Sequence, residues 1–247
     1  MPVLNFFPQI DQSSVAILGA AFFVVVIINL IPVLTYPFYI FYVAIHELGH
    51  VFAALLSGRK VIGFWVFSNA SGVTVSEKYK SNFDLFIGAT AGYIGRTLFA
   101  ALLILLTGLP QFASYTLMGL GILLVLLMFL YGKQTISDTG NLPRVTLVST
   151  AGVGVILMGI AWIADQEWSL FTLDILAIEG AFIALHTITD DLAAQIEVKG
   201  RQRNLDPDRV EDITGCSARF WQVAWSILSI IILGAAFWFT WLRNWPA

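Results

Sequence analysis

The sequence predicts an all-α integral membrane protein with about seven transmembrane helices and one short β-hairpin between the second and the third. Three observations predict this fold class. The 247 residues are 58% hydrophobic and 12% charged, with a mean hydropathy of +0.82, which is too apolar for a soluble domain. Apolar stretches of about 20 residues, the length that crosses a bilayer, recur along the chain. Basic residues gather in alternate connections between these stretches.

Seven apolar stretches are long enough to be transmembrane helices. They run over residues 15–34, 37–57, 83–107, 113–131, 145–163, 170–192 and 220–242. Only Thr35 and Tyr36 separate the first two, and Pro37 suits the first position of the following helix. The segment before the first stretch has no basic region, so we expect that helix to be a retained anchor. No internal repeat is evident, and we expect residues 1–247 to form a single membrane domain.

The basic residues also predict how the chain is oriented. If the seven stretches alternate in direction, the loops on one side carry nearly all the basic residues and those on the other carry only Arg243. Because cytoplasmic loops are enriched in Lys and Arg, we expect a cytoplasmic N-terminus and an external C-terminus. Residues 193–219 then form a cytoplasmic loop, in which the one cysteine, Cys216, stays reduced and inert. The basic residues assigned to the cytoplasmic side are Arg59, Lys60, Lys78, Lys80, Lys133, Arg144, Lys199, Arg201, Arg203, Arg209 and Arg219.

Residues 60–77 are expected to form the β-hairpin. β-Branched and aromatic residues flank the segment from Ser68 to Gly72, which has the composition of a turn. A hairpin this short is marginal in water, so we expect it to lean on the helices or to dip into the membrane face. It is either an ordinary connection or an exposed strand with which an unwound segment of a substrate can pair.

The second apolar stretch contains His46, Glu47 and His50 in the sequence HELGH. Positions i and i+4 share one face of a helix, so the two imidazoles can bind one zinc ion with Glu47 beside the metal-bound water. Charged side chains in hydrocarbon cost roughly 2–3 kcal/mol each on insertion scales, so they are rarely placed there without a partner or a function. The alternative is a pair of histidines that cap or bridge neighbouring helices.

A third zinc ligand is expected elsewhere, because catalytic zinc usually has three protein ligands and one open position. In the sixth apolar stretch, Glu179, His186 and Asp190 fall within roughly 40° of one another around the helix. We prefer Asp190, whose carboxylate would offset the zinc charge at a depth similar to that of the HELGH histidines. His186 is the rival, either as a ligand or as a hydrogen-bonded partner of Asp190. Asp191 suits the helix end, and Glu179 suits a structural pair with Arg96.

Several segments resemble, in their order and spacing, those of a known family. They are HELGHVFAALLSGRKV, SGVTV, ATAGYIGRTLFAALL, HTITDDL and LDPDRVEDITGCSARFWQVAW, and together they cover residues from about 40 to 230. The family is the site-2 protease type of intramembrane zinc metalloprotease, and the closest likeness is to its compact branch of membrane metallopeptidases. The resemblance implies that His46 and His50 bind zinc, that Glu47 is the general base and that a carboxylate from a later helix completes the site.

The chain departs from that family at two places. The Asn-Pro-Asp-Gly-like segment that supplies the later carboxylate in better-known members is absent, so Asp190 depends on its position along the helix alone. Asp206, which matches the first Asp of a Ser-Asp-Ala-Asp run in the compact branch, is a further candidate in a polar loop. Arg96 stands where a small residue is expected.

The expected function is therefore a zinc-dependent intramembrane endopeptidase that hydrolyses peptide bonds of membrane-spanning substrates, with Glu47 as general base. Such a substrate must unwind locally, because a helical backbone shields its carbonyl groups. The alternative is a zinc-binding membrane protein without proteolytic activity, either a chaperone-like relative or a metal carrier. A structural membrane protein without metal is a third possibility. The expected partners are a membrane-protein substrate and the lipid bilayer, with no nucleic acid, and the oligomeric state is left open.

Overall fold

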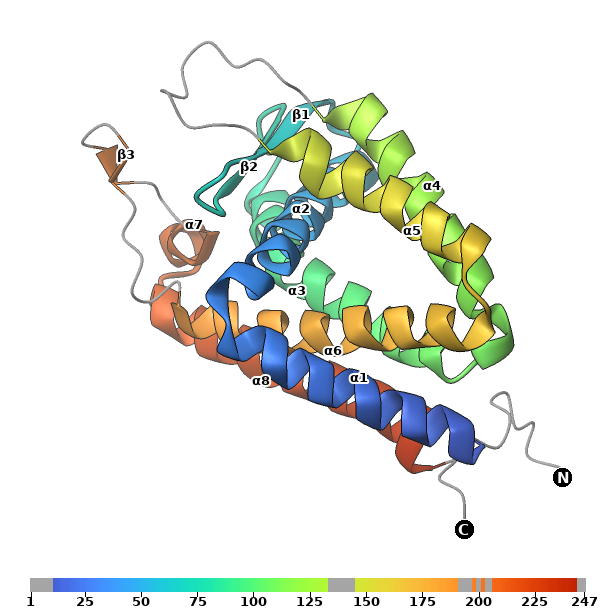
Figure 1. Ribbon diagram of the computed structural model, residues 1–247. Helices are drawn as coiled ribbons and strands as arrows, with labels where there is room; N and C mark the ends of the chain where they lie inside the picture. The colour runs from blue at the N-terminus through green and yellow to red at the C-terminus, as the bar shows by residue number, and fades with distance from the viewer. Residues whose placement is uncertain (1–10, 133–144, 191–196, 199–200, 203–205, 244–247) are drawn as a thin grey trace, which may run out of the picture.

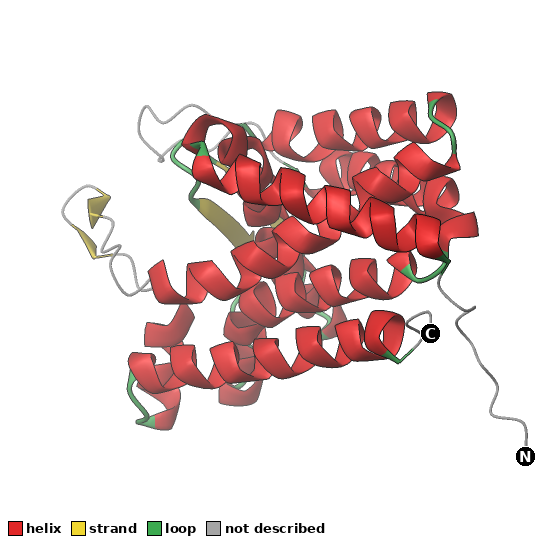
Figure 2. Cartoon of the chain, turned by 60° about the horizontal axis from the view of Figure 1, so that its bottom comes forward, coloured by secondary structure: helices red, strands yellow, loops and turns green. Residues whose placement is uncertain are grey.

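The computed structural model is an assembly of long helices with two small two-stranded sheets (Figures 1 and 2). It describes residues 11–132, 145–190, 197–198, 201–202 and 206–243, with the backbone alone for 187–190, 197–198 and 201–202. The helices are α1 (Gln12–Leu30), α2 (Pro32–Leu56), α3 (Asn82–Thr107), α4 (Ala113–Tyr131), α5 (Val153–Ile163), α6 (Gln166–Asp190), α7 (Asp206–Thr214) and α8 (Ala218–Phe237). The short helical segments are the 3-10 helix η1 (Pro110–Phe112) and the π-helical η2 (Val148–Gly152) and η3 (Trp238–Leu242), which adjoin α5 and α8. The strands are β1 (Val61–Val66), β2 (Gly72–Ser76), β3 (Glu197–Val198) and β4 (Arg201–Gln202).

The predicted fold class is confirmed. Among the described residues, six helices are long and apolar enough to cross a membrane, and the apolar helix Val148–Ile163 is shorter. The six run over Gln12–Leu30, Pro32–Leu56, Asn82–Thr107, Pro110–Tyr131, Gln166–His186 and Ala218–Leu242. The chain is therefore a multi-pass membrane protein.

The first two helices are divided earlier than the sequence suggests. Ile31 has an extended backbone with φ −124°, and Pro32 occupies the first turn of α2, where a missing N–H costs nothing. Pro37 consequently lies inside α2. The start of α1 and the end of η3 lie at the same end of the assembly in both views (Figures 1 and 2). If α1 and α8 both cross the bilayer, the two termini therefore lie on one side of it, whereas the basic residues predict a cytoplasmic N-terminus and an external C-terminus.

The predicted hairpin is present and consists of β1 and β2. The two strands are antiparallel, and Val66 pairs with Gly72 across the turn. The outer edge of β1 is covered, because Val66 O accepts a hydrogen bond from Val145 N at 2.9 Å and Val66 N donates one to Thr146 Oγ1 at 2.9 Å. In the described part of the chain β2 pairs only with β1. The second edge of β2 is thus the one at which another strand can add.

A polar network fastens the base of the hairpin to the helices. Arg59, which is buried just after α2, donates from Nε to Asp84 Oδ1 of α3 at 3.1 Å and from Nη1 to Ser76 Oγ of β2 at 2.6 Å. Its guanidinium also lies 4.3 Å from the centre of the Tyr79 ring. Lys80 Nζ donates to Ser57 O at 2.7 Å, where the last carbonyls of α2 need donors. The hairpin is therefore held against the C-terminal end of α2.

Close helix contacts determine how α2 sits in the bundle. A side chain at Gly49 would place a Cβ 2.3 Å from Ala91 O, so the backbones of α2 and α3 approach each other closely there. The ring of Tyr42 fills the space beside Gly180 of α6, and its hydroxyl donates to a carbonyl of that helix. Glu179, which the sequence suggests as a partner of Arg96, accepts a hydrogen bond from Asn29 of α1 at 3.0 Å.

Candidate metal centre

His46 and His50 lie one turn apart on α2 and point to the same side. Their Nε2 atoms are 3.1 Å apart. His50 Nδ1 lies 2.7 Å from Gly88 O on α3, and a carbonyl only accepts, so Nδ1 carries the proton. Nε2 of His50 is then the atom that can bind a metal ion once it has given up its own proton, and the ring is held in place by the neighbouring helix, as is common for metal-binding histidines.

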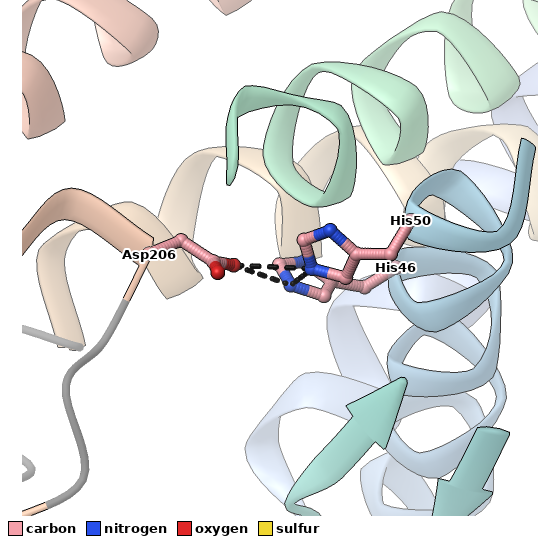
Figure 3. Close-up of side chains that lie close together, drawn as sticks. All are labelled: His46, His50 and Asp206. Atoms are coloured by element: carbon pink, nitrogen blue, oxygen red, sulfur yellow. Dashed lines mark hydrogen bonds and ion pairs between the residues drawn. The ribbon is translucent and has the colours of Figure 1, made fainter. Parts of the chain in front are cut away.

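Asp206, the first residue of α7, completes the group (Figure 3). Its Oδ2 lies 3.1 Å from His50 Nε2 and 3.4 Å from His46 Nε2. Zinc bound tetrahedrally at 2.0–2.1 Å has ligand atoms roughly 3.3 Å from one another. The three potential ligand atoms lie within 4.8 Å of one another, so two imidazoles and one carboxylate form a donor set that fits zinc.

The neighbouring helix α3 leaves room for the imidazole of His46. A Cβ at Gly92 would lie 2.3 Å from His46 Nε2, so only glycine fits beside this ring. The Tyr93 ring approaches His46 edge-on, with centroids 4.9 Å apart, and stacks on Trp225 of α8 at 5.0 Å. His46 is thus enclosed by α3 on one side and faces Asp206 on the other.

Helix α7 is held in place by an apolar contact and two hydrogen bonds. Val210 is fully buried in a small cluster with Ala89 and Trp225. Trp221 Nε1 donates to Thr214 Oγ1 at 3.0 Å, and the Ala218 N–H donates to a carboxylate of α7 at 2.7 Å. These contacts connect α7 to α3 and α8, and so they place its first residue against α2.

The electrostatic surroundings keep Asp206 ionised. Burial alone would raise the pKa of this carboxyl, but the charge of His50 and hydrogen bonds from both imidazoles outweigh burial and hold the pKa below its ordinary value. Arg209 Nη1 lies 3.9 Å from the other oxygen, Oδ1. A carboxylate that is negative before a cation arrives is suited to bind one.

Glu47 lies beside this group and is buried, with 4% of its surface exposed. Thr74 Oγ1 of β2 lies 2.7 Å from Glu47 Oε2 and 3.0 Å from Glu47 O. Gly72 adjoins the same carboxylate, because a Cβ there would lie 2.3 Å from Glu47 Oε1. Strand β2 of the hairpin therefore contacts the carboxylate of Glu47 through Thr74 and Gly72.

The predicted site residues have different outcomes. His46, Glu47 and His50 lie together on α2. Asp190 ends α6, but its side chain lies outside the described residues. His186 is exposed on α6 and is not part of the group that could hold a metal ion among the described residues. Asp191 likewise falls in a segment for which no structure is described.

Asp206 was only a secondary candidate on sequence grounds. It lies in a stretch that reads as a polar loop, yet Asp206 and Pro207 begin a short helix in the manner typical of helix starts. The match with the compact branch was the signal that singled it out. Sequence periodicity connects residues within one helix, so it could not relate Asp206 to α2.

Comparison with protein families gives a match over residues 16–236 to a family described as Peptidase M50B-like. That range includes both histidines, Glu47 and Asp206. No curated protein and no solved structure matches the chain.

Proposed function

We propose that this chain, which belongs to the Peptidase M50B-like family, is a zinc-dependent intramembrane endopeptidase. Family membership and the apolar helices place it among membrane metallopeptidases. The observation that carries the finer proposal is the meeting of His46, His50 and Asp206 beside the buried carboxylate of Glu47.

His46 and His50 through Nε2, and Asp206 through Oδ2, are the proposed zinc ligands. When bound there, zinc supplies a Lewis acid that polarises a carbonyl and lowers the pKa of water. Asp206 offsets part of the positive charge and fixes the position at which the two imidazoles converge. Asp190, whose side chain is not described, is the competing third ligand.

Glu47 is the proposed general base. It follows His46 directly on α2, so its carboxylate lies next to the imidazoles without being one of the three grouped ligands. In the proposed reaction, a carboxylate oxygen of Glu47 takes a proton from the attacking water and returns it to the leaving amine. The peptide bond is cleaved by addition of one water molecule, so protons and atoms balance within this cycle.

The substrate is proposed to be a membrane-spanning segment that is extended where it is cut. Helical backbone shields its carbonyl groups, and an extended segment can pair with a strand edge. The outer edge of β1 is covered at Val66, whereas β2 offers an edge beside Glu47. A substrate strand added to β2 would lie next to the proposed base and ligands.

The test is Glu47→Gln, measured in lipid vesicles with a single-span reporter whose cleavage is followed by electrophoresis and with zinc content measured on the same preparation. We expect the variant to hold zinc like the wild type and to lose cleavage. A wild type that holds zinc but cleaves no reporter would support the chaperone-like alternative. If the vesicles take up zinc, and Glu47→Gln does not change that uptake, the protein would instead be a metal carrier.

A further inference from the structure

We propose that Thr74 is the positioning residue of Glu47, and that β2 sets the proposed general base against the metal centre. The inference rests on the proposed function, because it assigns a role to a residue that acts only through Glu47. The evidence is the face that β2 turns towards α2, formed by Gly72, Thr74 and Ser76.

The Thr74 hydroxyl has two acceptors on one residue. Its Oγ1 lies 2.7 Å from Glu47 Oε2 and 3.0 Å from Glu47 O. A hydroxyl has one proton to donate, and the shorter, charge-assisted bond to Oε2 is favoured over that to the backbone carbonyl, so Thr74 holds this oxygen of the carboxylate. Because Glu47 is buried, a hydrogen bond to its charged group is worth more than one at the surface. Thr74 therefore restricts where the carboxylate can turn.

Gly72 restricts the same carboxylate by leaving a space of limited size. A Cβ at this position would lie 2.3 Å from Glu47 Oε1 and 2.6 Å from Glu47 Cγ. Those atoms belong to a flexible side chain, so an added methyl group would push the carboxylate aside before it would move the strand. Gly72 thus leaves space for Oε1 of Glu47, while Thr74 forms a hydrogen bond with Oε2.

The register of the strand explains why these two residues act together. Side chains alternate along a strand, so positions 72, 74 and 76 share one face. Ser76 Oγ, at the far end of that face, accepts a hydrogen bond from Arg59 Nη1 at 2.6 Å. Within the hairpin, the cross-strand partner of Thr74 on β1 is Phe64, which is fully buried. The strand is held at Arg59 and Phe64, and the hydroxyl of Thr74 is therefore held in place with it.

The placement has a consequence for catalysis. The edge of β2 proposed to receive the substrate belongs to the strand that holds Glu47. Substrate pairing would order this strand and, through Thr74, the carboxylate, so binding and alignment of the base are coupled. If Thr74 had only a structural role, it would attach the hairpin to α2, and its loss would lower stability without a separate effect on kcat.

Three variants separate these roles. Thr74→Val keeps the shape and branching of the side chain but removes the hydroxyl, Thr74→Ser keeps the hydroxyl, and Val75→Thr is a control on the opposite face. The assay is cleavage of an internally quenched apolar peptide in mixed micelles, together with zinc content and melting temperature. We expect Thr74→Val to lower kcat by roughly 10–100-fold, with KM and zinc content unchanged and the melting temperature lowered by at most a few degrees. We expect Thr74→Ser to recover much of that rate, whereas Val75→Thr cleaves like the wild type.

A binding measurement gives a second readout that does not depend on turnover. A simple peptide hydroxamate, which binds a metal ion and hydrogen-bonds to a neighbouring carboxylate, is titrated calorimetrically into each zinc-loaded variant. Glu47→Gln, Thr74→Val and Gly72→Ala should each weaken binding by about tenfold. Thr74→Val should add nothing further in the Glu47→Gln background, because Thr74 acts through that carboxylate.

The outcomes distinguish this inference from the proposed function. If the wild type cleaves the peptide and Glu47→Gln does not, but Thr74→Val retains full kcat, the inference about Thr74 is wrong and the proposed function stands. The inference would also be overturned if Thr74→Val melted far below the wild type and Gly72→Ala bound the hydroxamate like the wild type. Thr74 would then serve only to attach the hairpin to α2. A wild type that neither cleaves the peptide nor binds the hydroxamate would overturn both.

Discussion

Oδ2 of Asp206 lies 3.1 Å from Nε2 of His50, although helices α3 to α6 separate the two residues in the chain. The contact depends on α7, which is too short to span a membrane and docks on α3 and α8. The candidate metal centre therefore has two proposed ligands on one long helix and a third on an element that docks against it. The stability of the site therefore depends on how firmly α7 is attached.

The identity of the third ligand is tested by Asp206→Ala and Asp190→Ala. We expect Asp206→Ala to lower zinc affinity by more than about 100-fold, because loss of a ligand should cost more than loss of a group that only orients one. Asp190→Ala should bind zinc with the affinity of the wild type. Asp208→Ala, on the same helix as Asp206, is the control and should do the same. Zinc is measured by plasma mass spectrometry after dialysis against a weak chelator. Zinc loss in Asp190→Ala, with zinc retained in Asp206→Ala, would place the site at the end of α6.

The space that Gly92 leaves for His46 gives a second prediction. In Gly92→Ala, the new Cβ would overlap His46 Nε2, so the imidazole must turn away from Asp206. We expect zinc affinity to fall by at least about tenfold while the melting temperature of the metal-free protein stays within a few degrees. Gly159→Ala is the matched control, since its Cβ would meet nothing within 4 Å and helical Gly→Ala favours folding by roughly 0.5–1 kcal/mol. Equal zinc affinities in the two variants would contradict the crowding argument.

The helices and the paired histidines follow from patterns that are local in sequence. Apolar stretches of bilayer length predict spans without knowledge of packing, and the spacing of His46 and His50 places both on one face whatever surrounds them. The hairpin was predictable for the same reason, because its turn and its strands are contiguous.

The proposed third ligand could not be found in this way. Asp190 was preferred because it lies on the polar face of an apolar helix, which is a periodic argument within one element. Asp206 reaches α2 because Val210 is buried against α3 and α8, and that contact joins segments far apart in the chain. Gly72 and Thr74 were read only as parts of a hairpin, since nothing in their own segment indicates that Glu47 lies against them. Tertiary packing supplied each of these relationships.

The docking of α7 predicts the kinetics of metal release. Trp221→Phe keeps an aromatic ring at this position but removes the indole N–H that donates to Thr214 Oγ1. Helix α7 should therefore detach more often. We expect zinc to dissociate about tenfold faster into excess chelator, monitored with a fluorescent zinc indicator. Trp168→Phe, at an exposed position of α6, is the control and should release zinc at the wild-type rate. An unchanged release rate in Trp221→Phe would mean that Val210 and its neighbours hold α7 without this hydrogen bond.

The network around Arg59 predicts a stability effect that is separate from the metal. Arg59→Ala removes hydrogen bonds to Asp84 and Ser76, so the free energy of unfolding should fall by about 2 kcal/mol. Thermal melting in detergent measures it, and limited proteolysis should show earlier cleavage within residues 60–77. Lys78→Ala, at an exposed position of the same connection, serves as control. If both variants melt alike, the hairpin is held by its apolar side chains.

The orientation of the chain is tested with its own cysteine. Cys216 is exposed between α7 and α8, in the segment that the distribution of basic residues assigns to the cytoplasm. A membrane-impermeant maleimide should therefore label Cys216 in inverted vesicles and not in right-side-out ones, with Cys216→Ser as the blank. Gln111→Cys in that background puts a thiol in η1, between α3 and α4, and should give the opposite pattern. Because both reporters are measured in the same vesicles, labelling of both from one side would show that not all three of the helices α4, α5 and α6, which lie between the reporters in the chain, cross the membrane. Labelling of Cys216 from outside, with Gln111→Cys labelled from within, would mean that the chain is inserted the other way round.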